Sequence, residues 1–169
     1  IKIFDILVHK KIKNVLIPKR IYKKFNTFIE VYDYYKEGDL FNYITSNELT
    51  FQDKLHLIKC ITTIIKDLHS INLTHRDIKL ENFLIKKENN TITPVLIDFD
   101  YANFSNMNIS FNGGTLMYIP PERFNMKIHK YDMKSSDIWA LGILFYTILF
   151  EGCIWDKPDY DTDIHFRQY

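Results

Sequence analysis

The sequence predicts an α+β fold in two lobes, a small strand-containing lobe followed by a larger, mostly helical one. Two segments rich in β-branched and aromatic residues, 15–22 and 28–34, come early in the chain. Two long helical segments, 51–70 and 137–150, come later and carry regularly spaced apolar residues. Strands followed by a helix-rich block, rather than strands alternating with helices, are typical of α+β proteins.

Composition and charge limit the class of protein. The chain has 169 residues and a hydrophobic fraction of 46%, which supports one sizeable core and argues against a disordered chain. The whole chain has a net charge of +1, but the charge is unevenly distributed. Residues 1–29 hold eight Lys or Arg and a single acid, Asp5. No motif combines these basic residues with stacking groups, so they predict a solvated face and no nucleic-acid partner. Cys60 and Cys153 have apolar neighbours and no metal-ligand spacing, which predicts reduced core thiols in a cytoplasmic or nuclear protein.

The first elements are short. Residues 1–10 carry apolar side chains at helical spacing, which predicts the last turns of an amphipathic helix. The strands at 15–22 and 28–34 are joined by a polar turn at 23–27. A helix at 40–45 is expected to follow them.

A long helix is predicted next, at 51–70, with Thr50 as its N-cap. Apolar residues recur along one of its faces at helical spacing. The expected buried face consists of Leu55, Ile58, Ile61, Ile65 and Leu68.

Two short strands, 83–86 and 95–97, are expected to flank a turn. A last helix, 137–150, is predicted to begin at a cap supplied by Ser135 or Ser136. Its apolar run is about thirteen residues long, which is too short to cross a bilayer. The sequence therefore predicts a buried core helix and no membrane span.

One loop carries most of the chemistry. Residues 75–82, with the sequence HRDIKLEN, contain a carboxylate, an ammonium group and an amide between a long helix and a short strand. Phosphoryl transfer needs such groups, because a carboxylate orients the attacking hydroxyl, a cation binds the transferred phosphate and an amide oxygen binds a metal. Asp77, Lys79 and Asn82 are therefore the predicted catalytic residues.

A further carboxylate follows at the end of a predicted strand. Asp98 comes twenty-one residues after Asp77. It is expected to share a divalent ion with Asn82. Oxygen ligands combined with phosphate oxygens favour Mg²⁺ over zinc.

These motifs resemble those of eukaryotic-type protein kinases. Residues 75–82 resemble the HRDxKxxN catalytic loop, and residues 98–100 resemble a DFG motif whose glycine is replaced by aspartate. The sequence GTLMYIPPE at 114–122 is similar to the GTxxYxAPE end of an activation segment, with proline in place of alanine. DIWALG at 137–142 resembles the DxWxxG start of a buried central helix. Residues 32–40 resemble the last small-lobe strand, the hinge and the start of the next helix.

The resemblance implies a role for each catalytic residue. Asp77 would orient the substrate hydroxyl, and Lys79 would steady the γ-phosphate of ATP. Asn82 and Asp98 would bind Mg²⁺. A lysine two residues after the aspartate is the serine/threonine-kinase pattern, and Thr115, expected to bridge Asp77 and Lys79, agrees with it.

The resemblance also places the nucleotide. The main chain at Asp33 and Tyr35 would meet the adenine edge. Leu84 would lie under the ring, and Asp39 would contact the ribose. With Asp98, these residues form the predicted ATP site.

Several neighbouring residues are given structural or regulatory roles. His75 is expected to be a buried core histidine rather than a base, and Asp137 a buried acceptor for backbone amides of the catalytic loop. Arg76 is placed to receive a phosphate group from the activation segment. The family's usual phosphosite falls on Phe111, so the neighbouring Ser110 is the predicted site.

The predicted hinge divides the chain. Residues 1–35 would be a remnant of the small lobe, and residues 36–169 a large lobe that lacks its final helices. No glycine-rich loop and no strand lysine precede Ile1 in this sequence. The isolated chain is therefore expected to be marginally stable and inactive.

Two positions depart from the family pattern. Counting back from Asn14 puts the helix glutamate that pairs with the strand lysine at Ile3, so either the register slips there or the ion pair is lost. Asp100 replaces a glycine, which would restrict the backbone. Alternatively, its carboxylate attracts another cation.

The predicted function is ATP-dependent phosphoryl transfer to Ser or Thr hydroxyls of protein substrates. The alternative is a pseudokinase that acts as a scaffold or allosteric partner, which Ile3 and Asp100 favour. A small-molecule kinase of the aminoglycoside-phosphotransferase type shares the Asp and Asn pattern. Residues 114–122 and 137–142 argue against that third possibility, because they form a platform for protein substrates.

Substrate preference is indicated only weakly. Glu81 and Asp39 are placed like acids that favour basic residues before the target, as in calcium/calmodulin-kinase-like enzymes. Thr147 stands where a further such acid often lies, which argues the other way. The sequence gives no indication of a regulatory partner.

Overall fold

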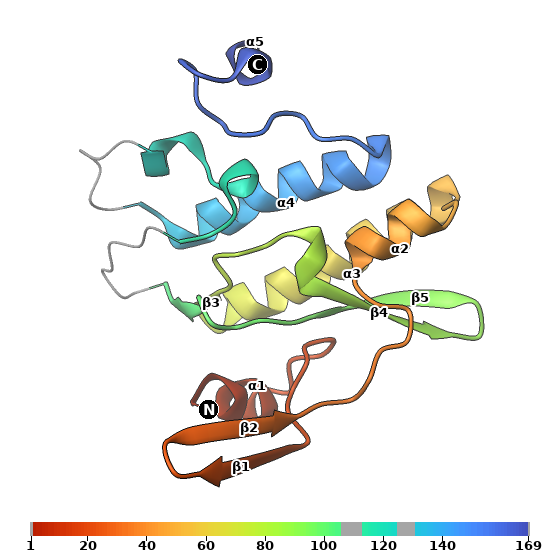
Figure 1. Cartoon of the computed structure of the whole chain (residues 1–169), viewed down its shortest axis with the longest axis vertical. Coiled ribbons are helices and arrows are strands. Elements are labelled where there is room, and N and C mark those ends of the chain that lie inside the picture. The colour runs from red at the N-terminus through yellow and green to blue at the C-terminus, as the bar shows by residue number, and fades with distance from the viewer. Residues whose placement is uncertain (1, 106–112, 125–130, 169) are drawn as a thin grey trace.

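The computed structural model describes residues 2–105, 113–124 and 131–168. Figure 1 shows helix α1 (Lys2–His9) and the hairpin of β1 (Arg20–Lys24) and β2 (Thr27–Val31) together at one end. The remaining elements are stacked beyond them. This agrees with the predicted α+β fold of two unequal lobes. The predicted boundary after residue 35 falls in the connection between β2 and α2, and it stays a prediction.

The larger part is mostly helical. Its helices and strands are α2 Leu40–Ser46, α3 Phe51–Ser70, β3 Leu73–Thr74, β4 Phe83–Glu88, β5 Thr91–Leu96, β6 Asn103–Phe104, α4 Met133–Phe150 and α5 Ile164–Gln168. Short 3-10 turns cover Leu80–Asn82, Leu116–Tyr118 and Pro121–Phe124. In Figure 1, α4 lies along one side of α3 and the β4–β5 hairpin along the other, so α3 is the central layer.

The first predicted strand begins later than expected, at Arg20 rather than at residue 15. Val15 instead forms a parallel bridge with Leu96 of β5, and the Leu16 N–H donates to the Leu96 carbonyl at 2.8 Å. Pro18 follows, and it has no N–H with which to continue a ladder. The consequence is a backbone link between the small part of the molecule and the strand that leads to Asp98.

Helix α3 begins and ends where the sequence predicts. Thr50 and Asp53 form a capping box, in which each side chain accepts from the backbone N–H of the other residue. The buried face differs in part from the expected one, because Leu55 is 40% exposed. The residues buried on α3 are Leu57, Ile61, Ile64, Ile65 and Leu68.

Replacing Thr50 with alanine should lower the free energy of unfolding by about 1 kcal/mol, because it removes an N-cap acceptor. Thr62 provides the matched control, since it is an exposed residue of the same helix whose hydroxyl only donates to the Ile58 carbonyl. Urea denaturation of the two variants compares the effects. Equal losses for Thr50→Ala and Thr62→Ala would show that the capping box does not stabilise the protein.

The β4–β5 hairpin is longer than predicted. The ladder extends from the Phe83–Leu96 pair to the Glu88–Thr91 pair and leaves a two-residue turn. Asn89 and Asn90 both have positive φ, 47° and 62°. Asparagine tolerates this conformation, which matches the twist of antiparallel strands. The sequence predicted a turn here. Because the residues around it are polar, it did not indicate that both strands continue up to the turn.

Helix α4 also begins earlier than predicted, at Met133. Its N-cap is Asp132, which accepts from the backbone N–H groups of Lys134 and Ser135, so the predicted serine caps are wrong. The helix has 18 residues, and by length and apolar composition alone it would suit a membrane span. Half of it is buried inside the protein, which is the arrangement predicted for a core helix.

The two cysteines are not core residues. Cys60 is half-buried on α3, and Cys153 is exposed just after α4. The prediction of core thiols was therefore wrong, because apolar neighbours in sequence do not set the side of a helix on which a residue lies. Burial raises the pKa of the Cys60 thiol, so the thiol stays protonated near neutral pH.

Candidate active site

The predicted catalytic loop rests on a buried carboxylate of α4. Asp137 is 1% exposed and accepts hydrogen bonds from the backbone N–H groups of His75, at 2.9 Å, and Arg76, at 2.8 Å. The Nε2 atom of His69 also lies 2.9 Å from Asp137 Oδ2. A buried carboxylate needs such partners. The prediction that Asp137 is a structural acceptor is confirmed.

A stack of rings ties the loop to the first helix. His75 is fully buried, and its Nε2 lies 2.9 Å from the Ile97 carbonyl oxygen. Its ring meets Phe99 edge-on at 5.2 Å, and Phe99 meets Phe4 of α1 edge-on at 6.2 Å. His75 is therefore a core histidine, as predicted. The stack connects the catalytic loop, the Asp98 segment and α1.

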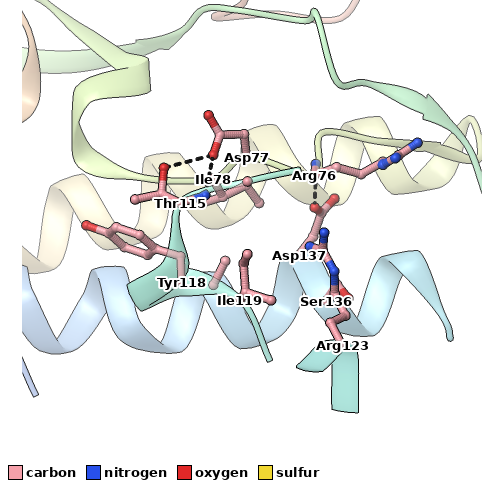
Figure 2. Close-up of a pocket in the computed structure, with 11 residues that line it drawn as sticks. Arg76, Asp77, Ile78, Thr115, Tyr118, Ile119, Arg123, Ser136 and Asp137 are labelled. Atoms are coloured by element: carbon pink, nitrogen blue, oxygen red, sulfur yellow. Dashed lines mark hydrogen bonds between the residues drawn. The ribbon is translucent and has the colours of Figure 1, made fainter. Parts of the chain in front are cut away.

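Asp77 lies at the centre of a tight polar group. Its carboxylate is 2.7 Å from Lys79 Nζ and accepts from the backbone N–H and the hydroxyl of Thr115, each at 3.1 Å. Lys79 also donates to the Thr115 hydroxyl oxygen at 3.1 Å. The predicted bridge by Thr115 is present, and Figure 2 shows its bonds to Asp77. Because Asp77 is only 6% exposed, these partners fix its carboxylate.

Asn82 connects this group to Asp98. Its amide nitrogen donates to the Asp77 carbonyl oxygen at 2.8 Å and to the Asp77 carboxylate at 3.1 Å. The Asn82 amide oxygen therefore points away from Asp77. The Asn82 carbonyl accepts from the N–H of Ile97, at 2.9 Å, which holds the exposed Asp98 next to the loop.

The donors fit a hard divalent cation. Asn82 and Asp98 offer an amide oxygen and a carboxylate, which suit Mg²⁺ when phosphate oxygens and water supply the remaining ligands. Within the described part of the chain, no three His, Cys, Asp or Glu side chains form a metal-binding group.

The structure places the predicted adenine-side residues around the start of α2. Gly38 and Asp39 lie against β4, because the Ile85 N–H donates to the Gly38 carbonyl at 2.9 Å and Asp39 bridges Leu84. The Asp39 carboxylate caps α2 by accepting from the Asn42 N–H at 2.8 Å. This cap gives Asp39 a structural role beside the predicted ribose contact, which stays a prediction.

Two other residues of the predicted nucleotide site lie in the connection before α2. Asp33 is exposed and forms an ion pair with Lys19 at 2.5 Å. Tyr35 lines a hollow shared with Ile85 and Lys86 of β4, and burial raises the pKa of its hydroxyl. The predicted contact of their main chain with adenine stays a prediction.

A small cavity of about 10 Å³ lies behind the catalytic loop. Figure 2 shows Arg76 and Arg123 among its lining residues, and burial lowers the pKa of both guanidinium groups. Arg123 donates to the Gly113 carbonyl oxygen and lies over the Tyr131 ring, 5.2 Å from its centroid. The sequence did not indicate Arg123, because nothing in its neighbourhood shows that it folds back beside Arg76.

Gly114 also lines this cavity, and its backbone conformation favours glycine. It has φ of 109°, and a Cβ there would lie 3.3 Å from the Arg76 carbonyl oxygen.

Gly114→Ala should therefore destabilise the protein by about 1–3 kcal/mol and disturb the adjacent Thr115. Gly142→Ala in α4 is the control, because nothing lies within 4 Å of its added Cβ, and it should stabilise by about 0.5–1 kcal/mol. Thermal unfolding distinguishes the two, and a neutral Gly114→Ala would contradict the expected strain.

The predicted phosphosite lies outside the described residues. Ser110 and Phe111 both belong to the segment 106–112. The prediction that Ser110 is phosphorylated is therefore not addressed by the structure. Thr147, by contrast, is described and only 7% exposed, so it does not lie on a surface that a substrate contacts.

Comparison with known proteins agrees with this geometry. The sequence matches the family model described as the protein kinase domain over residues 1–168. The chain belongs to the protein kinase family. The predicted resemblance is thus confirmed, and the aminoglycoside-phosphotransferase alternative loses its support.

Several relatives are similar over most of this kinase chain. It is 31% identical to the serine/threonine-protein kinase ppk24, mitochondrial, of Schizosaccharomyces pombe, over 96% of this chain and 37% of that protein. It is 32% identical to the probable serine/threonine-protein kinase 2 of Plasmodium falciparum, over 86% of this chain and 29% of that protein. Identity to the serine/threonine-protein kinase PRR2 of Saccharomyces cerevisiae is 30%, over 80% of this chain and 20% of the relative. The kinase chain thus spans less than half the length of these relatives.

The replaced glycine of this kinase does not strain the backbone. Asp98 has φ of 61°, whereas Asp100 is not among the described residues with positive φ. The Asp100 N–H donates to the Asp98 carboxylate at 3.2 Å. The side chain of Asp100 was expected to strain the backbone, but in this conformation it does not, because the backbone at position 100 does not need the freedom of glycine.

One anchoring residue was missed by the sequence analysis. Trp155 is 2% exposed, its Nε1 donates to the Met117 carbonyl oxygen at 3.1 Å, and its ring stacks on Trp139 at 5.9 Å. It holds the segment after α4 against the 3-10 turn that follows Thr115. The sequence feature that could have indicated this role is a single tryptophan within a polar stretch.

Proposed function

We propose that this kinase domain transfers the γ-phosphoryl group of ATP to Ser or Thr hydroxyls of protein substrates. The observation that carries the proposal is the group of Asp77, Lys79 and Thr115. A buried carboxylate held between an ammonium and a hydroxyl is suited to orient an incoming alcohol and to accept its proton. Protein kinases as a family bind ATP with a divalent metal, and Asn82 and Asp98 would hold Mg²⁺ here.

Each residue has a defined part in this reaction. Asp77 accepts a hydrogen bond from the substrate hydroxyl and takes its proton as the new oxygen–phosphorus bond forms. Lys79, 2.7 Å from Asp77, is close enough to neutralise charge on the transferred group. Mg²⁺, when bound, offsets negative charge on the phosphate oxygens. The Lys79 position and the Thr115 bridge support Ser and Thr as acceptors.

A pseudokinase scaffold is the second candidate. The observation that favours it is Ile3 on α1, the position at which counting back from Asn14 puts the helix glutamate of the family unless the register slips. Asp100 no longer supports this alternative, since the backbone at position 100 is not strained. The two candidates differ in whether the complete polypeptide turns over ATP.

A direct assay distinguishes them. The complete polypeptide that contains residues 1–169 is incubated with labelled ATP, Mg²⁺ and a degenerate peptide library, followed by phosphoamino-acid analysis. Phosphoserine or phosphothreonine without phosphotyrosine supports the proposal. Binding of MgATP without any transfer would support the scaffold instead.

The same library tests the proposed substrate preference. Glu81 is an exposed residue of the catalytic loop, so it is available to attract a basic residue that precedes the acceptor. We expect enrichment of Arg and Lys before the target, reduced by Glu81→Gln. Equal use of acidic and basic peptides would remove the calcium/calmodulin-kinase-like assignment.

A further inference from the structure

The hairpin of β1 and β2 carries a group of exposed aromatic residues that the proposed function does not use. Figure 1 shows this hairpin at the opposite end of the molecule from α5. Every residue of the two strands is exposed, and within the described part of the chain β1 pairs with β2 alone. Tyr22, Phe25 and Phe28 are all exposed, Phe25 by 87%. Single exposed apolar residues are common, but apolar residues that gather in one place mark an interaction surface.

The turn of the hairpin does not favour the phenylalanine that it contains. The pairing of Lys24 with Thr27 leaves only Phe25 and Asn26 in the turn, and Phe25 has φ of 53°. Glycine, asparagine or aspartate usually takes such a position, because a bulky side chain is disfavoured at positive φ. The tip therefore carries an aromatic ring in a disfavoured backbone conformation, which indicates a role outside the fold.

The chain around this tip is strongly basic. Residues 6–29 hold seven Lys or Arg and no Asp or Glu. All seven basic residues are exposed, and Lys19 is the one among them that forms an ion pair with an acid of the described chain. The sequence predicted a solvated basic face here. The structure adds that two of these lysines, Lys23 and Lys24, lie directly beside the turn.

Lysine and aromatic side chains are interleaved at the end of the hairpin. Lys23 is paired with Phe28, and its Nζ lies 5.9 Å from the centroid of the Phe28 ring. Side chains alternate along a strand, so Lys23 and Lys24 lie on opposite faces of the hairpin. An apolar tip with a cation on either side fits the boundary between the head groups and the acyl chains of an anionic membrane. Aromatic rings insert at this boundary, and ammonium groups stay among the phosphates.

We propose that the β1–β2 hairpin docks the kinase domain onto a membrane surface rich in anionic lipids. Phe25 inserts at the lipid interface, while Lys23 and Lys24 bind lipid phosphates from the two sides of the hairpin. One inserted ring and a few lysines give weak, reversible attachment, so the hairpin orients the domain at the surface and does not anchor it permanently. This docking is independent of the proposed phosphoryl transfer.

A nucleic acid is another polyanion that basic residues attract. Proteins that bind single strands use a groove that follows the backbone, with aromatic side chains on which the bases stack. Phe25 instead protrudes from a two-residue turn at the end of a two-stranded sheet. This convex shape favours insertion into a lipid layer.

Co-sedimentation with vesicles tests the proposal, using the complete polypeptide that contains residues 1–169. It should bind mixed phosphatidylcholine–phosphatidylserine vesicles and bind pure phosphatidylcholine vesicles much less. Replacing Lys23 and Lys24 together with glutamine should lower the partition coefficient about 25-fold, since each lysine near an anionic surface contributes about fivefold. Replacing Lys59 and Lys66, two exposed lysines of α3, with glutamine is the matched control and should leave binding unchanged.

Phe25→Gly separates membrane insertion from folding. Glycine suits the positive φ of this position, so the variant should unfold at the temperature of the wild type or above it. Its binding to the anionic vesicles should fall about tenfold, because the inserted ring is lost. Phe150→Ala removes an exposed ring from α4, and as the control it should bind these vesicles like the wild type.

Several results would overturn the proposal. These are no binding to anionic vesicles, equal binding to both kinds of vesicle, or binding that survives the loss of Lys23 and Lys24. Normal binding by Phe25→Gly would show a basic surface without insertion, which also contradicts the proposal. Tighter binding to nucleic acid than to anionic vesicles, lost in the same variants, would assign the hairpin to a nucleic acid instead. Phosphoryl transfer is measured without vesicles, so none of these results affects the proposed function.

Discussion

Replacing Asp77 with asparagine should lower kcat for peptide phosphorylation by about 10²–10⁴-fold, the usual contribution of a positioned acid–base group. Asparagine has nearly the same shape, so its amide oxygen can still accept from Thr115. What is lost is the charge that attracts the substrate proton and that pairs with Lys79 at 2.7 Å. The affinity for MgATP should change much less than kcat, because Asp77 is not assigned to the nucleotide.

The measurement is steady-state phosphotransfer by the complete polypeptide, with thermal unfolding as the check on folding. Asp161→Asn, in an exposed loop far along the chain, is the matched substitution and should leave kcat unchanged. A kcat near that of the wild type in Asp77→Asn would refute the proposed role of Asp77. It would also move the balance toward a contaminating activity and a scaffold function.

The second large effect concerns stability. Asp137→Ala should lower the free energy of unfolding by about 3 kcal/mol or more, because it leaves two buried backbone N–H groups without their acceptor. The His75 and Arg76 amides are the groups affected, and they belong to the loop that carries Asp77. Phosphotransfer should be lost together with stability.

Urea denaturation measures this effect, and two further variants sharpen it. Asp137→Asn keeps one oxygen acceptor and should lose less than Asp137→Ala. Asp156→Ala removes an exposed carboxylate from a loop and should be within about 0.5 kcal/mol of the wild type. If Asp137→Ala unfolds like Asp156→Ala, the catalytic loop is held by other contacts.

Local signals were sufficient for several elements. Thr50 and Asp53, three residues apart before an apolar pattern, determine the start of α3, because a capping box needs only neighbours in sequence. The bonds that Asp77, Lys79 and Asn82 make with one another are equally local, since they join residues at most five positions apart. Such features follow from the sequence without knowledge of the fold.

The sequence by itself determined the family, the catalytic loop, the metal ligands to be tested and the long helix, because each depends on residue type and short spacing. Only the tertiary structure decided which side of a helix is buried at Leu55 or Cys60, since both faces of α3 carry apolar residues. It also brought Glu30 of β2 into the cavity that Ile3 lines from α1. These two residues are twenty-seven positions apart, and no spacing rule relates a helix to a strand that packs against it. They are close because the helix packs against the strand, and this packing depends on many weak contacts distributed over the whole chain.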